Sequence, residues 1–418
     1  MLKLHSKTDR PDFNYLNKVL QESLRQGIKI QVSNELQIEL KNELISAKLA
    51  LQNYGVYNPN KRTELIAVLE ELSKSDDMVK ECCYVNDKWT TAQPALKKLA
   101  HHGNQFVIDL MYYRRISKYL SYVDSLLSFS DEKGYIHPVL CGSTTNRIQY
   151  KDPGIMNIPK QLLWGVIQPR NDKWSLYSVD IKNQEPWILI NMLDIQELKD
   201  LLAISKNGSL YDMLFVTFYN KMPTAIERKE FKIAWNALTY GATKKGIKAA
   251  CNNIDSDVVY KYFNQLSGYK KYKKDMNAKA YSGCTKAETL FGTEVVATGA
   301  TKQKIVRQLM NLGIQGTGAD ILAFLVKHFE DEKKDKKLAN YMHIYFTRHD
   351  ECVVEISKYY EKKIGGEAAV CGLLFDMFEH QIDDWEPFNL EIHKVHDTIN
   401  SLFTDSSIED DEDVYEDD

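Results

Sequence analysis

The chain has 418 residues, of which 44% are hydrophobic and 27% are charged. This composition is typical of globular proteins, and the length favours two or three domains. No run of 18 apolar residues occurs and the start lacks the apolar region of a signal peptide, so we expect neither a membrane span nor secretion. Seven cysteines without a CxxC spacing predict free thiols in a reducing cytosol and argue against a zinc site.

The net charge of −4 is unevenly distributed along the chain. Residues 405–418 hold nine acids and no base, and we expect this tail to be disordered. The rest of the chain contains 54 basic and 49 acidic residues. Its net charge of +5 is compatible with nucleic-acid binding. The tail itself is compatible with a docking role and equally with a purely solubilising one.

Apolar residues at helical spacing dominate residues 13–130. One amphipathic helix is expected across 36–51, a break follows at 57–60, and another helix begins near Thr63. A further helix is expected over about 104–129. This part of the chain is therefore predicted to be almost entirely helical.

The residue pattern of the sequence changes after residue 130. Frequent glycine and proline predict strands and loops over 131–180, and helices return between Pro186 and about 280. A segment rich in glycine and threonine at 281–301 precedes a helix near 302–313 and another helix after Asp320. The expected fold class is α+β, with a sheet assembled from distant pieces of the chain.

The first candidate site residue ends a predicted strand. Apolar residues from Leu176 to Val179 are followed by Asp180, and a helix is expected from about Pro186, a favourable residue in a first helical turn. Asp180 suits either an active-site carboxylate or an ordinary turn residue. Upstream, the segment 144–147 is an irregular loop with one basic residue.

Two later helices each present a polar face. Arg228, Lys232, Asn236 and Tyr240 follow one another at steps of four, so they share one helix face. Two cations one turn apart can hold a triphosphate, Arg by its planar fork and Lys as a point charge. The alternative is a solvated basic face.

The second polar face is formed by Arg307, Asn311 and Gln315, again at steps of four. Amide side chains can read minor-groove acceptors, which all base pairs offer at similar positions. The alternative is a polar helix face that ends at the glycines of residues 316 and 318.

The run from Tyr345 to Ile356 predicts a hairpin, because β-prone apolar residues flank a tight turn that carries His349, Asp350 and Glu351. Such a turn presents acidic side chains at a sheet edge, where carboxylate oxygens can hold a divalent metal. A His-Asp-Glu triplet alone is a weak signal.

In their order and spacing these segments closely resemble family A DNA polymerases, the bacterial DNA polymerase I type, over nearly the whole chain up to about residue 400. The family patterns are Asp-x4-Glu, Arg-x3-Lys-x7-Tyr-Gly, Arg-x3-Asn-x3-Gln-Gly-Thr-x-Ala-Asp and His-Asp-Glu. The residues that match them are Asp180 and Glu185, then Arg228, Lys232, Tyr240 and Gly241, then Arg307, Asn311, Gln315 and Asp320, and finally His349, Asp350 and Glu351.

The resemblance implies a right-hand polymerase fold, with an antiparallel palm sheet and a mostly helical thumb and fingers. It places N-terminal helices and the thumb at 1–130, the palm at 131–195 and 301–404, and the fingers at 196–300. The acidic tail at 405–418 lies beyond this fold.

The implied activity is template-directed addition of dNTPs to a primer 3′-OH by two-metal-ion nucleotidyl transfer. Asp180 and Asp350 would hold two Mg²⁺ ions, for which Mn²⁺ is a possible substitute. Glu351 would support the metal site without being an essential ligand, and Lys232 would protonate or neutralise pyrophosphate.

The resemblance also implies the binding residues. Those for the incoming dNTP are Arg228, Lys232, Asn236, Tyr240 and Glu185, of which Glu185 would exclude a ribose 2′-OH. Those for DNA are Arg147, Arg307, Asn311, Gln315 and His349. Three positions depart from the family pattern, since Asn236 stands where an aromatic residue is usual, Trp187 where Arg is usual, and Asn146 where glycine precedes Arg147.

The stretch after Leu24, close to the start of the chain, resembles the segment that opens the family's polymerase region. The sequence therefore predicts a phage-like polymerase module without 3′–5′ exonuclease or 5′ nuclease domains. The expected partners are primer–template DNA, dNTPs and a separate exonuclease or processivity factor, in the cytoplasm of a bacterial or phage-infected cell. The alternatives are a lesion-bypass or repair polymerase and a non-catalytic DNA-binding subunit of a split replicase. The intact Asp180 and Asp350 argue against the last.

Overall fold

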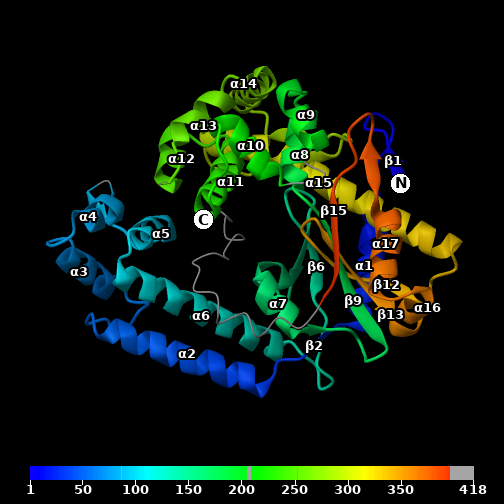
Figure 1. Cartoon of the computed structure of the whole chain (residues 1–418), viewed down its shortest axis with the longest axis horizontal. Helices are drawn as coiled ribbons and strands as arrows, with labels where there is room; N and C mark the ends of the chain where they lie inside the picture. Colours follow the sequence, from blue (N-terminus) through cyan, green and yellow to red (C-terminus); the bar gives the residue numbers. More distant parts are fainter. Residues whose placement is uncertain (86, 205–208, 252, 396–418) are drawn as a thin grey trace. The chain divides into compact units, whose positions relative to one another are not determined.

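The computed structural model describes residues 1–85, 87–204, 209–251 and 253–395 (Figure 1). Its contacts divide the chain into two compact units. The larger unit contains residues 1–29, 137–156 and 168–395, and the smaller unit contains residues 30–136 and 157–167. The expected acidic tail at 405–418 lies outside the described residues.

These units differ from the domain bounds expected from the sequence. Residues 1–29 were expected with the helices of 1–130, whereas they belong to the larger unit because α1 (Phe13–Gln26) packs against β12 (Met342–Arg348). The chain passes between the units within or beside the short strands β2 (Ile28–Ile30), β5 (Tyr135–Ile136) and β8 (Ile167–Gln168) and within the short helix η1 (Ile155–Asn157). The names palm, fingers and thumb stay predictions.

The smaller unit is built on two long helices that pack side by side, α2 (Asn34–Gln52) and α6 (Gln105–Ser128) (Figure 1). Ser33 caps α2 by accepting from the backbone N–H of Leu36, and Asn104 caps α6 in the same way. These helices confirm the two helices expected across 36–51 and over about 104–129. The unit also contains α3 (Arg62–Leu72), α4 (Asp77–Cys83), β3 (Tyr84–Val85), β4 (Lys88–Trp89), α5 (Gln93–His101) and α7 (Lys160–Val166).

The helix α7 is a correction, because residues 131–180 were expected to contain only strands and loops. Pro159 precedes this helix, and the helix buries its residues Leu162, Leu163 and Trp164. A seven-residue helix is shorter than the window in which helical periodicity can be recognised. The pattern therefore gave no signal for it.

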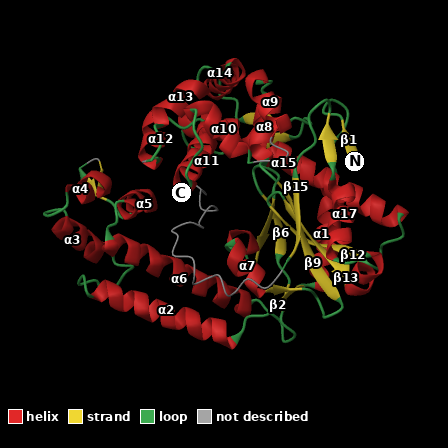
Figure 2. Ribbon diagram, in the orientation of Figure 1, coloured by secondary structure: helices red, strands yellow, loops and turns green. Residues whose placement is uncertain are grey.

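The larger unit is organised by a four-stranded antiparallel sheet in the order β12-β13-β9-β15. Its further strands are β13 (Glu351–Ser357), β9 (Trp174–Ile181) and β15 (Leu390–Lys394). Helix α17 (Glu367–Phe378) packs against β15, and Figure 2 shows the strands with α1 and α17 beside them. Because β9 lies between two strands from much later in the chain, the sheet joins distant segments, and an α+β fold is confirmed.

The other elements of the larger unit are mostly helices. They are β1 (Leu2–Leu4), β6 (Val139–Gly142), β7 (Ile148–Lys151), η1 (Ile155–Asn157), α8 (Gln184–Met192), α9 (Gln196–Ile204), α10 (Leu210–Tyr219), α11 (Ala225–Thr239), α12 (Lys244–Ala250), α13 (Ser256–Phe263), α14 (Ser267–Tyr281), β10 (Lys286–Glu288), β11 (Glu294–Val296), α15 (Lys302–Asp335), α16 (Lys358–Ile364) and β14 (His380–Ile382).

An aromatic cluster holds helices α10, α11 and α13 together. Trp235 of α11 is fully buried and meets Phe263 of α13 edge-on, with ring centroids 4.6 Å apart. Phe231 of α11 lies 5.5 Å from Phe215 of α10 in the same geometry. Such edge-to-face pairs add about 0.5–1.5 kcal/mol beyond area burial. The inner face of α11 is thus committed to the core, and its other face is available for a site.

The helix α15 is one continuous helix of 34 residues, where the sequence analysis expected two helices separated at glycines. The glycines do not break it; they allow close packing. A Cβ at Gly318 would overlap Oε1 of Gln184, and one at Gly316 would lie 2.7 Å from Cγ2 of Thr289. Helix α15 is long and apolar enough to cross a membrane, but 83% of its apolar window is buried inside the protein, as in the core helix of a globular protein.

A buried carboxyl group, that of Asp320, ties the β10–β11 turn to α15. Thr289 and Thr293 each donate a hydroxyl hydrogen bond to it, the second at 2.9 Å. Burial raises the pKa of Asp320 to about 6, although the two hydrogen bonds oppose the shift. Because the folded state holds this proton more tightly than the unfolded chain does, the contribution of Asp320 to stability falls as the pH rises from about 4 to 6.

We therefore expect the Asp320→Asn variant to gain stability relative to the native protein as the pH rises. Between pH 5 and 8 the gain should be roughly 1 kcal/mol, since one pKa unit corresponds to about 1.4 kcal/mol. Urea unfolding at both pH values measures the difference. Asp331→Asn, an exposed position on the same helix, is the control and should show no such trend. An equal difference at both pH values would contradict the prediction.

Candidate active site

The predicted His-Asp-Glu hairpin is present, with one correction. Arg348 of β12 pairs with Glu351 of β13, so only His349 and Asp350 form the turn and Glu351 is a strand residue. His349 has a φ of 52°, as a two-residue hairpin loop requires at its first position. The turn therefore presents Asp350 at the end of the sheet.

One of the two candidate metal-binding carboxylates, Asp180, lies near the end of β9, and the other, Asp350, lies in the turn that leads into the neighbouring strand β13. In the register of β13 and β9, Glu351 is the partner of Asp180, and this places Asp350 next to Asp180 although the two are far apart in sequence. Burial raises the pKa of Asp350 above its usual range, and the negative charge of Asp180 raises it further. The Arg147 guanidinium acts in the opposite direction. The site is thus a concentrated pair of carboxylates.

The side chain of Glu351 is buried and has a local partner. Ser178, two residues before Asp180 on β9, donates its hydroxyl hydrogen to Oε1 of Glu351. Glu351 is the cross-strand partner of Asp180, so both side chains lie on one face of the sheet. Ser178 lies on the same face, because residues two apart on a strand point to the same side. The carboxylate of Glu351 is therefore hydrogen-bonded to a β9 residue two positions before Asp180. The supporting role of Glu351 at the metal site stays a prediction.

Glu185 joins two other candidate residues. Its Oε1 lies 2.7 Å from Nη2 of Arg147, and its Oε2 accepts a hydrogen bond from the hydroxyl of Tyr240. Glu185 sits in the first turn of α8, directly after Asn183 takes a left-handed conformation with φ 53°. Trp187, which stands where the family usually has Arg, is buried with its ring 5.2 Å from that of Phe388.

The predicted polar face of α11 is present and begins at a well-capped end. Thr224 and Glu227 form a capping box, which satisfies donors that the first helical turn leaves unpaired. Nε of Arg228 lies 2.7 Å from Asp212, and Nζ of Lys232 lies 5.8 Å from the ring centroid of Tyr211. Each of these partners belongs to α10.

The end of α11 packs against α15. A Cβ at Gly241, where φ is 79°, would lie 2.8 Å from Sδ of Met310, so only glycine fits there without displacing that side chain. On α15, Arg307 is exposed, and Asn311 and Gln315 are half-buried one and two turns further on. The predicted face of Arg307, Asn311 and Gln315 therefore exists on this helix.

Hydrogen bonds, strand pairing and electrostatic interaction connect one group of the predicted residues directly. This group consists of Asp180, Asp350, Glu351, Glu185, Arg147 and Tyr240. The remaining predicted residues lie on two helices and in the hairpin turn: Arg228, Lys232 and Asn236 on α11, Arg307, Asn311 and Gln315 on α15, and His349 in the turn. All of them belong to the larger unit.

Sequence reasoning missed Ser178 and three residues at the start of α10: Ser209, Tyr211 and Asp212. The Ser-x-x-Asp spacing of Ser209 and Asp212 is a helix-start signature, and Ser209 does cap α10 by accepting from the backbone N–H of Asp212. That spacing predicts where a helix begins, but it does not predict which other helix packs against it. The contacts of these residues with α11 depend on tertiary packing.

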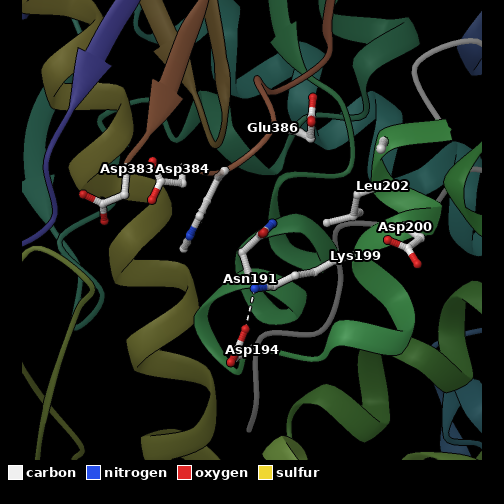
Figure 3. Close-up of a pocket in the computed structure, with 10 residues that line it drawn as sticks. Asn191, Asp194, Lys199, Asp200, Leu202, Asp383, Asp384 and Glu386 are labelled. Atoms are coloured by element: carbon white, nitrogen blue, oxygen red, sulfur yellow. Dashed lines mark hydrogen bonds and ion pairs between the residues drawn. The ribbon is translucent and has the colours of Figure 1, made fainter.

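An open pocket of about 460 Å³ lies elsewhere in the larger unit (Figure 3). It is lined by residues of α8 and α9, by Asp194 between these two helices and by the segment 383–386, among them Asp200 and Glu386. None of the candidate site residues lines it. The candidate site residues lie at a sheet end and on helix faces.

Comparison with known proteins agrees with this geometry. A family model described as DNA polymerase family A matches residues 29–369. The DNA polymerase I of Rhizobium leguminosarum is 23% identical over 296 residues, which cover 64% of this chain and 28% of that protein. The DNA polymerase I of Chloroflexus aurantiacus is 23% identical over 269 residues, covering 59% of this chain and 28% of that protein.

A solved structure has the same fold: the POL domain of Pol1 from M. smegmatis, described as a complex with DNA primer-template and dNTP. The TM-score is 0.75 at 20% identity, over 92% of this chain and 69% of that one. The chain belongs to DNA polymerase family A, whose members generally use divalent metal ions. It spans somewhat more than a quarter of the length of the curated relatives that it matches.

Proposed function

We propose that the protein is a template-directed DNA polymerase that adds dNTPs to a primer 3′-OH. The observation that carries this proposal is the pair Asp180 and Asp350 at the end of the antiparallel sheet, with Glu185 and Arg147 beside it. Phosphoryl transfer requires mainly positioning and charge stabilisation, and carboxylates together with cations provide both.

The residues present fit Mg²⁺. Carboxylate oxygens are its preferred ligands, and the repulsion between Asp180 and Asp350 is what a bound cation would relieve. Among the described residues, no group of three or more His, Cys, Asp or Glu side chains is placed to hold a metal ion. An ion held by one or two carboxylates together with substrate phosphates is the usual arrangement for Mg²⁺. When bound, two Mg²⁺ ions would activate the primer hydroxyl and stabilise the leaving pyrophosphate.

The face of α11 would hold the triphosphate. Arg228 offers a planar fork of donors and Lys232 a point charge, one helical turn apart. Lys232 is also the group that would neutralise or protonate the departing pyrophosphate. Tyr240, held by Glu185, would pack at the templating base pair, and Asn236 would face the nucleotide between Lys232 and Tyr240.

The remaining polar residues would position DNA. Arg147 and His349 lie in loops at the carboxylate end of the sheet and would hold the primer terminus. Asn311 and Gln315 would contact the minor groove, and Arg307, the most exposed of the three on α15, would contact the backbone. A separate exonuclease or processivity factor and a cytoplasmic location stay predictions.

Glu185 would also exclude ribonucleotides. We expect Glu185→Ala to reduce the preference for dNTPs over rNTPs by about tenfold, roughly 1.4 kcal/mol, since the variant opens space and leaves Arg147 and Tyr240 without their shared carboxylate. Ratios of kcat/KM for one dNTP and its matching rNTP measure the change. Glu294→Ala, which removes an exposed carboxylate from β11, is the control. An unchanged ratio would remove Glu185 from sugar selection.

The test of the proposed function is extension of a labelled primer on a recessed template with Mg²⁺ and dNTPs. Extension that follows the template sequence would support the proposal. Absence of extension, when a binding assay shows that primer–template DNA is bound, would contradict it and favour a non-catalytic DNA-binding subunit.

A further inference from the structure

The start of α10 is attached to the polar face of α11 by side chains that have no part in the proposed chemistry. Asp212 and Ser209 contact Arg228, and Tyr211 contacts the next two positions of the face. The three residues at the start of α10 therefore meet three successive turns of α11.

Arg228 makes one ion pair and one hydrogen bond with the start of α10. Its Nε lies 2.7 Å from Oδ1 of Asp212, and its Nη2 donates to Oγ of Ser209 at 2.8 Å. A guanidinium carries five N–H donors in a fixed fork, so these two contacts leave donors for a phosphate. The Arg228 side chain is 44% exposed, so a ligand can reach it.

The Tyr211 contacts hold the rest of the face. Its ring lies under Lys232, and its hydroxyl donates to Oδ1 of Asn236 at 3.2 Å. Tyr211 is almost fully buried, so it can orient the α11 side chains but offers little surface to a ligand. Of the three α10 residues, only Asp212 carries a charge of the same sign as a triphosphate.

The Asp212–Arg228 pair contributes little to the fold. The side chains of Arg228 and Asp212 are 44% and 29% exposed, and ion pairs between partly exposed side chains typically contribute only about 0–1 kcal/mol. Both helices already have their own caps, at Ser209 for α10 and at Thr224 for α11. The pair does have a direct electrostatic consequence, because Asp212 partly cancels the positive charge that Arg228 presents to an anion.

We propose that Asp212 is a positioning residue that acts through Arg228, as an internal counter-anion with which the nucleotide triphosphate competes. This inference rests on the proposed function, since it concerns the same triphosphate site. Asp212 keeps the fork of Arg228 in place before the nucleotide binds and weakens nucleotide binding. It therefore sets the dNTP concentration at which the enzyme works.

The test is Asp212→Asn, which keeps an oxygen near Arg228 but removes the negative charge. We expect the KM for dNTP in primer extension to fall by about threefold to fivefold, the size of an exposed ion-pair interaction. The kcat should stay within twofold of the native value. Asp212→Glu should return the KM towards the native value, which loss of a structural contact would not explain.

Equilibrium binding of inorganic tripolyphosphate provides a readout that does not depend on catalysis. Asp212→Asn should bind this anion more tightly by the same factor, and the gain should vanish when Arg228 is also replaced by Gln. Asp257→Asn, which removes a comparable ion pair at 2.8 Å with Lys244, is the matched control and should change neither quantity.

The outcomes separate this inference from the proposed function. If the native protein extends primers, and Asp212→Asn neither lowers the KM for dNTP nor tightens tripolyphosphate binding, the inference is wrong and the function stands. If the native protein does not extend primers but Asp212→Asn still binds tripolyphosphate more tightly through Arg228, the function is wrong and the counter-anion role stands.

Discussion

Asp350→Asn is expected to slow primer extension by about 10³-fold while leaving primer–template binding intact. Metal-ion catalysis stabilises transition-state charge by several kcal/mol, and a factor of ten in rate corresponds to about 1.4 kcal/mol. Asparagine preserves the size of the side chain at the hairpin turn but removes the charge that a divalent ion requires. Single-turnover extension with saturating dNTP measures the loss.

The matched control for this substitution is Asp194→Asn. Asp194 has a left-handed φ of 51°, which asparagine tolerates, and it is exposed near an ion-pair partner, Lys199. This control should retain native activity. Binding of Mn²⁺ should be weakened in Asp350→Asn and unchanged in the control. Native extension rates in Asp350→Asn would exclude Asp350 as a metal ligand and overturn the proposed mechanism.

Lys232→Ala is expected to lower kcat by about 10²-fold, with a smaller effect on KM. Removal of one group that stabilises developing charge typically costs 10²–10³-fold in kcat. Lys232 lies on the α11 face one turn from Arg228, with its Nζ over the ring of Tyr211. Steady-state kinetics with a single incoming dNTP separates the two constants.

Lys221→Ala removes an exposed lysine just before α11, where it pairs with Glu227, and is the control for general loss of positive charge. It should leave kcat unchanged. Should Lys232→Ala raise KM and spare kcat, Lys232 would be a ground-state binding residue without a role in the departure of pyrophosphate. A thermal unfolding curve of each variant shows whether the fold is retained.

Local periodicity was sufficient for much of the architecture. The hairpin around Asp350, the strand that ends near Asp180 and the polar face of α11 were each expected from patterns that extend over a few residues. Local patterns failed where an element is short, as at α7, and where glycine has a packing role, as within α15. In α15 the neighbours Thr289 and Gln184 explain the glycines, and neither adjoins them in sequence.

The amino-acid order alone was enough to predict the α+β class, the helix faces and, through the resemblance of four spaced motifs, the family. The proximity of Asp180 to Asp350 depends on the register of β9 with β13, and the pairing of Asp212 with Arg228 depends on how α10 packs against α11. Periodicity reports which side of a helix or strand a residue occupies. It carries no information about which distant segment covers that side, because that choice is made by the packing of the whole core.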